Sequence, residues 1–272
     1  LLTGCIMTVK NPSLYKREPC NLAGLSVLVT RPEQQANELC LAIEKARGRP
    51  VRFPTIEILG PADKQAVRTE LADLAHYDLV VFISSNAVRY AFPLMPANIP
   101  LDLQVAAIGA ATAQALQEVG LDPTLLPNGD MNSEGLLALP QLQDVAGQRI
   151  LIVRGNEGRE TLRQTLQQRG ATVSYCEVYR RRIPQRNPNH LISQWDQMVE
   201  VVTVSSAQIL ENLINMLGEA GLERLRKTPL VVVSTRIAEL ADAQGCEVIY
   251  LSQSPMDADV VQTLCEVSRE LF

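Results

Sequence analysis

Hydroxyl and amide side chains stand at the ends of predicted strands, at matching places in the two halves of the chain. Ser84-Ser85-Asn86 follow the apolar run at 79–83, and Ser205-Ser206 follow the apolar run at 201–204. Serine and asparagine are favoured helix N-caps, so capping alone would explain them. In open α/β sheets, however, ligands bind outside the carboxyl ends of the strands, where free N–H groups at helix starts attract anions. The repeated Ser-Ser pair favours a binding role.

Further candidates for ligand binding stand at the ends of other predicted strands and at the starts of helical runs. Hydroxyls and backbone N–H groups in such turns suit anions, and an arginine can hold a carboxylate through two parallel hydrogen bonds. Ser133 could instead be only a helix N-cap with Glu134 in the first turn, and Arg31 could be a solvated turn residue. The candidates are Thr30, Arg31, Gly109, Thr112, Ser133, Glu134, Arg154, Gly155, Ser234 and Arg236.

The remaining reactive side chains argue against several kinds of catalysis. The two histidines, His76 and His190, have no metal-ligand partner at a suitable spacing and no nucleophile beside them. The sequence has no G-x-S-x-G motif and no cluster of cysteine and histidine, and Gly109 belongs to a G-x-x-T turn rather than a dinucleotide motif or P-loop. We therefore expect no metal, no cofactor and no covalent nucleophile. Hydroxyls, helix starts and a few arginines instead suit a polyanionic small molecule.

The candidates belong to a pattern of elements that occurs twice. Residues 27–59 and 150–182 each contain an apolar strand, a helix stopped by glycine and a second extended run. VVFISSNAV matches VVTVSSAQI, and VAAIGAATAQAL matches VVVSTRIAEL, so the copies are 121 to 125 residues apart. In the first copy, the second extended run contains Pro50 and Pro54. Prolines there indicate an edge strand or a connector. We predict two similar α/β lobes, each a parallel sheet flanked by helices.

Composition agrees with two domains of ordinary size. The chain has 272 residues, of which 46% are hydrophobic and only 4% aromatic. Few aromatic residues and a formal charge of −5 argue against a surface for nucleic acid or anionic membranes, and no apolar run is long enough to span a bilayer. The six scattered cysteines lack a C-x-x-C motif and are predicted to be reduced, packing thiols of a cytoplasmic protein.

At this level of detail the chain resembles the uroporphyrinogen-III synthase family. VFISSNAV, AAIGAATAQAL, NSEGLL, ILIVRGNEGRETL, CEVYRR and VSTRIAELADAQGCEV carry the resemblance, in order, over most of residues 25–271. It implies two flavodoxin-like lobes joined by a two-stranded antiparallel ladder. Residues 22–52 and 183–272 would form one lobe, and 60–175 the other. Segments 53–59 and 176–182 would pair as the ladder. Residues 1–21 match neither repeat, and we expect them to be a disordered extension or a start-site artefact.

The resemblance also implies an activity. Family members close hydroxymethylbilane, a linear tetrapyrrole with many carboxylates, to uroporphyrinogen III with inversion of ring D and loss of water. Tyr179 matches the tyrosine that the family places at the cleft, and we expect its phenol to assist departure of hydroxide. Alternatively, Tyr179 only caps the ladder. A monomer that receives its substrate by transient hand-over from hydroxymethylbilane synthase is expected.

Two other classes of protein have twin α/β lobes. One is a small-molecule binding protein of the periplasmic or repressor-effector type, whose lobes close on a ligand. No export signal and no DNA-binding helix pair is visible in the sequence to favour it. The other is a sugar-nucleotide transferase, for which the chain is short and lacks the usual phosphate loop.

Overall fold

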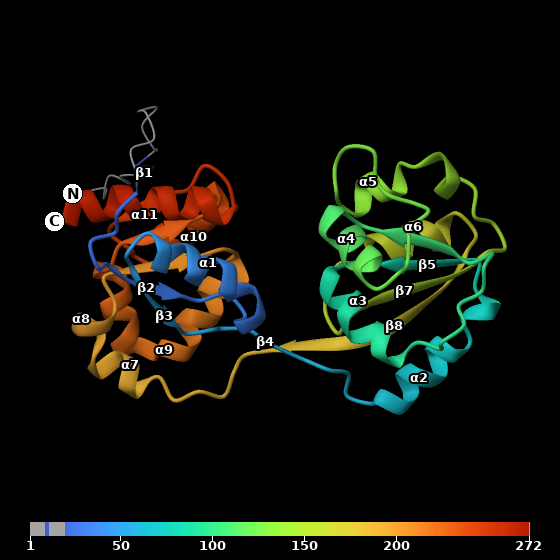
Figure 1. The fold of residues 1–272 in the computed structure, drawn as a ribbon, viewed down its shortest axis with the longest axis horizontal. Coiled ribbons are helices and arrows are strands. Elements are labelled where there is room, and N and C mark those ends of the chain that lie inside the picture. The colour runs from blue at the N-terminus through green and yellow to red at the C-terminus, as the bar shows by residue number, and fades with distance from the viewer. Residues whose placement is uncertain (1–8, 11–19, 272) are drawn as a thin grey trace, which may run out of the picture. The chain divides into compact units, whose positions relative to one another are not determined.

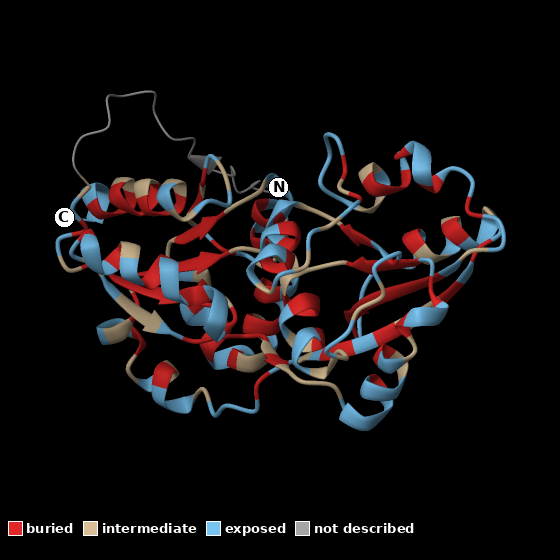
Figure 2. Cartoon of the chain, turned by 45° about the vertical axis from the view of Figure 1, so that its right-hand side comes forward, coloured by how far each residue is buried: buried red, intermediate tan, exposed pale blue. Residues whose placement is uncertain are grey.

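The computed structural model describes residues 9–10 and 20–271, and the chain divides into two compact units. Unit 1 comprises Leu1–Glu57 and Arg182–Phe272, and unit 2 comprises Ile58–Arg181. In each unit helices flank a sheet whose central strands are buried, whereas the outer faces of the helices are exposed (Figure 1 and Figure 2). The prediction of an α/β protein with two sheets flanked by helices is confirmed.

The sheet of unit 1 has the strand order β1-β11-β10-β9-β2-β3. Its strands are β1 (Val9–Lys10), β2 (Ser26–Val29), β3 (Arg49–Arg52), β9 (Val201–Val204), β10 (Leu230–Val232) and β11 (Ile249–Leu251). All of these pairings are parallel. β2 and β9 are apolar along most of their length because helices cover both faces of the sheet. Pro50 lies in the edge strand β3, as its missing N–H group requires.

Helices α1 (Glu33–Lys45) and α11 (Asp257–Leu271) cover one face of this sheet. Leu39 and Ile43 of α1 and Leu264 of α11 are fully buried there, against Val27 and Val201 of the sheet. The crossover β9–α9–β10 runs in the opposite direction along the sheet from β2–α1–β3, which puts α9 (Ala207–Lys227) on the other face. The remaining helices are α7 (Asn189–Ser193), α8 (Trp195–Met198) and α10 (Thr235–Ala243).

The sheet of unit 2 has the strand order β4-β8-β7-β5-β6, with β8, β7, β5 and β6 parallel. The strands are β4 (Glu57–Leu59), β5 (Leu79–Phe82), β6 (Gln104–Ala107), β7 (Arg149–Gly155) and β8 (Thr172–Arg182). The α-helices are α2 (Lys64–Ala72), α3 (Ser85–Ala91), α4 (Ala110–Glu118), α5 (Ser133–Leu137) and α6 (Thr161–Gln168). Short 3-10 turns are η1 (Leu74–His76), η2 (Phe92–Leu94) and η3 (Pro140–Leu142).

The chain enters unit 2 through β4 and leaves it through β8, and these two strands are neighbours at the edge of the sheet. Arg182 at the end of β8 donates from Nε to a carboxylate oxygen of Glu57 in β4, at 2.7 Å. The expected second member of the ladder, 176–182, is the last part of one long strand that begins at Thr172. The antiparallel direction of the β4–β8 pairing stays a prediction.

One feature of the N-terminal segment differs from what the sequence predicts. Val9–Lys10 form a strand beside β11, so this part of the expected disordered extension is in the sheet. Residues 1–8 and 11–19 lie outside the described part of the chain.

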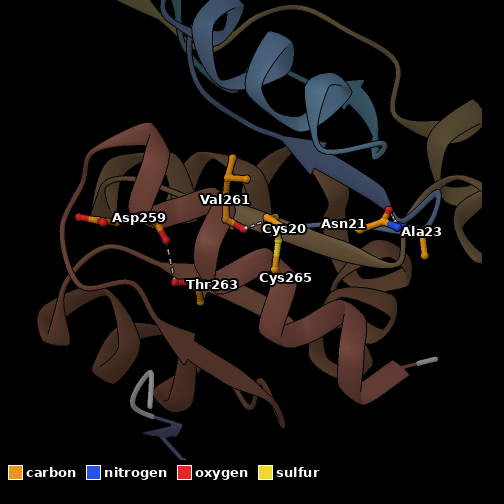
Figure 3. The surroundings of a disulfide bond; sticks show 7 residues. All are labelled: Cys20, Asn21, Ala23, Asp259, Val261, Thr263 and Cys265. Carbon is orange, nitrogen blue, oxygen red and sulfur yellow. Dashed lines mark hydrogen bonds between the residues drawn. A yellow bond between two sulfur atoms is a disulfide. The ribbon is translucent and has the colours of Figure 1, made fainter. Parts of the chain in front are cut away.

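The expectation that all the cysteines are reduced is wrong for one pair. Cys20 forms a disulfide with Cys265 of α11, and the Cα atoms are 5.8 Å apart (Figure 3). The fold brings the two together across 245 residues of sequence, a proximity that spacing along the chain does not reveal. Cys40, Cys176 and Cys246 are buried free thiols, as predicted, and Cys5 lies outside the described residues. No helix among the described residues is long and apolar enough to cross a membrane.

Candidate active site

The carboxyl edge of the unit 2 sheet brings several of the predicted residues together. β5 ends at Phe82, and Ser84 is the N-cap of α3, where its Oγ accepts from the backbone N–H of Ala87 at 3.1 Å. Ser85 is the first residue of α3, and Asn86 is buried in its first turn. Ser84 therefore both caps a helix and lies at the end of a strand. Helix capping and a ligand-binding role are thus compatible for the serine pair.

Tyr179 of β8 lies beside Ser84. Tyr179 is 3% exposed, and its ring stacks on that of Tyr90, with ring centroids 6.0 Å apart. Its Oη is 3.3 Å from Oγ of Ser84. The guanidinium of Arg181 is 5.8 Å from the centre of the ring. The hydroxyl is thus held at the carboxyl edge of the sheet rather than at the far end of the ladder.

Gly155, the last residue of β7, makes room for this tyrosine. A β-bulge after Arg154 shifts the register so that Gly155 lies opposite Tyr179. A Cβ atom at Gly155 would be 2.7 Å from two carbons of the Tyr179 ring, much closer than a normal contact. The absence of a side chain at this position therefore sets the position of Tyr179.

The turns after β6 and before α5 complete this edge. Gly109 is the N-cap of α4, and a Cβ there would be 3.3 Å from Cβ of Met131, so the turn before α5 lies against it. Thr112 is buried in the first turn of α4. Asn132 rather than Ser133 caps α5, because its Oδ1 accepts from the N–H of Gly135 at 2.8 Å. The N-cap interpretation of Ser133 is thus wrong.

Arg154 forms a compact polar cluster on the opposite face of β7 from Tyr179. Arg154 is 4% exposed, and its guanidinium stacks on the Tyr175 ring at 4.3 Å and donates to the Gly155 carbonyl and to Glu160, at 3.1 and 3.0 Å. Tyr175 donates to the other oxygen of Glu160 at 2.9 Å. This hydrogen bond, followed by the pairing with Arg154, holds the pKa of Glu160 below its ordinary value. Burial and then the same bond raise the pKa of Tyr175.

Unit 1 has a corresponding edge, and there the structure corrects one prediction. The Thr30 hydroxyl is fully buried and donates to the Thr203 carbonyl at 2.6 Å, so it links β2 to β9 and cannot donate to a ligand. Arg31 pairs with Asp257 at the start of α11 at 2.5 Å and donates to the Pro255 carbonyl. Arg31 is therefore not a solvated turn residue, and its role as a partner of a substrate carboxylate stays a prediction.

The serines of this edge lie where the repeat predicts them, with a shift of one residue. Ser206, not Ser205, is the N-cap of α9, and its Oγ accepts from the N–H of Ile209 at 3.2 Å. Ser206 is therefore the true counterpart of Ser84. Ser234 stands at the N-cap position of α10 without using its side chain as a cap, and Arg236 in the first turn is exposed.

Among the described residues no group of three histidine, cysteine or acidic side chains is arranged to hold a metal ion. His76 pairs with Asp73, three residues earlier, on the surface. Glu134 pairs with Arg159 at 3.3 Å, also on the surface. The groups assembled at the two edges are therefore hydroxyls, helix starts, arginines and one buried tyrosine.

Comparison with known proteins identifies the family of this chain. A family model described as "Uroporphyrinogen-III synthase HemD" matches residues 37–262. The chain belongs to the uroporphyrinogen-III synthase family. The uroporphyrinogen-III synthase of Salmonella typhimurium is 35% identical over 236 residues, which cover 85% of this chain and 96% of that protein. The protein of the same name from Escherichia coli is 34% identical over 242 residues, with the same coverage.

Solved structures of the uroporphyrinogen-III synthase family agree with the fold. A mutant uroporphyrinogen III synthase from Thermus thermophilus superposes with a TM-score of 0.60 at 20% identity, covering 91% of this chain and all of that one. The Helicobacter pylori protein gives 0.57 at 14% identity, with the same coverage. As a family member, the chain is a cyclising lyase of tetrapyrrole biosynthesis that acts on a tetrapyrrole. The binding-protein alternative finds no support in these comparisons.

Sequence reasoning about this uroporphyrinogen-III synthase family member missed the partners of Arg154. Tyr175 and Glu160 were not among the candidates, although Tyr175 lies four residues before Tyr179 in the same strand. No local pattern gave a signal for Tyr175, because the register that sets it opposite Ile152 puts it on the same face as Arg154.

Proposed function

We propose that this chain converts hydroxymethylbilane to uroporphyrinogen III with inversion of ring D, and that Tyr179 is the catalytic acid. The observation that carries the role of Tyr179 is its position: a buried phenol whose hydroxyl lies 3.3 Å from Ser84 at the carboxyl edge of a parallel sheet. Ligands bind at such edges in open α/β folds.

The reaction needs little from the protein beyond positioning and one mobile proton. As the C–O bond of the hydroxymethyl group breaks, the Tyr179 phenol gives its proton to the departing hydroxide, which leaves as water. The resulting azafulvene is attacked by the terminal ring at its substituted carbon, giving a spiro intermediate that fragments and recloses inverted. The last step releases a proton from carbon as the pyrrole becomes aromatic again, and this proton restores the phenol. Unaided closure gives the uninverted isomer, so the site must hold the chain in the productive conformation.

Substrate carboxylates would be met by neutral donors and arginines. At the edge of unit 2 we propose Ser84, Ser85, the turn of Gly109 and Thr112, and Ser133. A helix start contributes only about 0.3–1 kcal/mol to an exposed anion, so several must act together. Candidates with less structural support are Asn86, Glu134 and Gly155 of unit 2, and Ser205, Ser206, Ser234 and Arg236 of unit 1. Monomeric state, cytoplasmic location and hand-over from hydroxymethylbilane synthase stay predictions.

Replacing Tyr179 by phenylalanine tests the assignment. With freshly generated hydroxymethylbilane, Tyr179→Phe should lower kcat by roughly 10²- to 10⁴-fold, the usual effect of general acid catalysis, while the remaining product keeps the inverted isomer. Tyr90→Phe is the matched control, since it removes a hydroxyl from the stacked partner ring that donates to the Ile58 carbonyl at 3.0 Å. Unchanged turnover in Tyr179→Phe would remove the proposed role, and formation of only the uninverted isomer by the wild-type protein would remove the function.

A further inference from the structure

A small cavity opens in unit 2 beside Arg154, on the face of the sheet that α5 and α6 cover. Its volume is about 120 Å³. Four side chains form apolar walls: Ile83, Ile108, Ile152 and Leu162. The register of the sheet brings these residues together. Phe82, just before Ile83, pairs with both Ala107 and Val153. Ile152 pairs with Tyr175 on the other side of β7. The cavity therefore lies at the carboxyl ends of β5, β6 and β7.

The remaining lining is polar, and each of its two arginines is paired with a glutamate outside the lining. It comprises Ser133, Arg154, Arg159 and Tyr175. Arg154 is the buried member, and its Nε and Nη1 are occupied by the Gly155 carbonyl and Glu160. An arginine has five N–H donors, and no hydrogen bond from Nη2 of Arg154 is found within residues 9–10 and 20–271. Gly158 leaves that nitrogen uncovered, since a Cβ there would be 3.0 Å from it.

A second donor of the same cluster also lacks an acceptor. Arg163 lies over the Tyr175 ring at 4.8 Å, and its Nε is buried without a hydrogen-bond partner in the described part of the chain. Buried donors are seldom left unpaired in native proteins, so an unpaired one points to a missing group or water. Within residues 9–10 and 20–271, the carboxylate found paired with these two stacked arginines is that of Glu160, which is 47% exposed. The cluster can therefore accept a further anion.

We propose that this cavity binds one carboxyalkyl side chain of the tetrapyrrole, an acetate or propionate arm, with its carboxylate on Arg154 and its methylene carbons against the isoleucines. The size fits: at roughly 30 Å³ for each water-sized group, the cavity holds about four non-hydrogen atoms. Glu160 and Tyr175 are positioning residues that fix the plane of the Arg154 guanidinium. This inference rests on the proposed function, since it takes the tetrapyrrole as ligand.

The test fills the cavity without changing a charge. Ile108→Phe puts a larger side chain into the wall, and Ile183→Phe, at a side chain that is 42% exposed, is the matched control. We expect Ile108→Phe to raise KM for hydroxymethylbilane by roughly 10- to 100-fold, which corresponds to the loss of one hydrogen bond to a charged group. The kcat should stay within about twofold of the wild-type value. If Ile108→Phe fails to fold, Ile83→Phe replaces it, because Ile83 also lines the cavity and is only partly buried.

A binding measurement separates this subsite from the activity as a whole. Sodium propionate, titrated into the wild-type protein, should shift the Nε–H resonance of Arg154 in ¹⁵N NMR, whereas neutral propionamide should not. The resonance is assigned with Arg154→Lys, and Ile108→Phe should abolish the shift. An unchanged KM and an unchanged propionate shift in Ile108→Phe would overturn the subsite while leaving the synthase function intact. Failure of the wild-type protein to form the inverted isomer would instead refute the proposed function.

Discussion

The contact between Gly155 and Tyr179 allows a sharp test of how the tyrosine is positioned. Gly155→Ala adds one methyl group, which would lie 2.7 Å from ring carbons Cε2 and Cζ and 3.1 Å from Oη of Tyr179. Carbon atoms normally approach to about 3.5–4.0 Å, so the ring must move by roughly 1 Å. Tyr90 stacks against the ring, so movement of the ring would disturb this packing.

Two effects should follow from that movement. Overpacking of this kind costs about 1–3 kcal/mol of unfolding free energy. The distance between Oη of Tyr179 and Oγ of Ser84, now 3.3 Å, would exceed hydrogen-bonding range, and a misplacement of about 1 Å can cost up to roughly 10² in rate. Stability is measured by urea unfolding followed by circular dichroism, and kcat with hydroxymethylbilane.

Gly60→Ala is the control, because its Cβ would meet only ordinary contacts at 3.9 to 4.0 Å. A second control removes the ring: in a Tyr179→Ala background, Gly155→Ala should cost less than about 0.5 kcal/mol, since the clash is gone. An equal loss of stability in both backgrounds, or full turnover of Gly155→Ala, would refute the reasoning that Gly155 sets the position of Tyr179.

Three further predictions concern side chains away from this contact. Thr30→Val should lose about 1 kcal/mol, the value of the buried hydrogen bond to the Thr203 carbonyl, and leave KM unchanged; a raised KM at equal stability would restore a binding role. Burial raises the pKa of Cys176 to about 12, from 9.0. The unfolded thiol therefore loses its proton at lower pH than the folded one, and stability falls as pH rises from about 9 to 12. Between pH 9 and 11 the wild type should lose unfolding free energy more steeply than Cys176→Ala, by at most about 1.4 kcal/mol per pH unit, and parallel curves from urea titrations would contradict this. Alkylation of the denatured protein, purified without reductant, should leave Cys20 and Cys265 unlabelled by mass spectrometry; labelling of both would show that the bond is absent from the protein in solution.

The two-unit fold was predictable because each strand carries its own signal. Runs such as VVF and VVTV are apolar along all or most of their length, as expected for strands covered on both faces, and they recur at nearly one spacing. Ser84 and Ser206 were recognisable because an N-cap stands where a strand gives way to a helix. Local patterns such as these do not depend on what other parts of the chain do.

The details of the site depend on register, which the sequence does not encode locally. In a regular strand Tyr175 and Tyr179, four apart, would share a face. The bulge after Arg154 leaves Tyr175 opposite Ile152 and Tyr179 opposite Gly155, which lie on different faces of β7. One tyrosine therefore joins the arginine cluster and the other joins Ser84. For the same reason, no local pattern predicts the pairing of Cys20 with Cys265.

Insertion of unit 2 into unit 1 imposes an order on biosynthesis. β2 is a central strand whose neighbour β9 follows about 170 residues later, after the whole of unit 2 has been made. On the ribosome, unit 2 can complete its sheet while one edge of β2 still waits for a partner. An unpaired apolar strand edge is a template for aggregation. A nascent chain halted before Val201 would therefore contain a folded unit 2 and a strand β2 with one unpaired edge. Stalling and premature termination in this interval should therefore burden chaperones more than stops placed earlier or later.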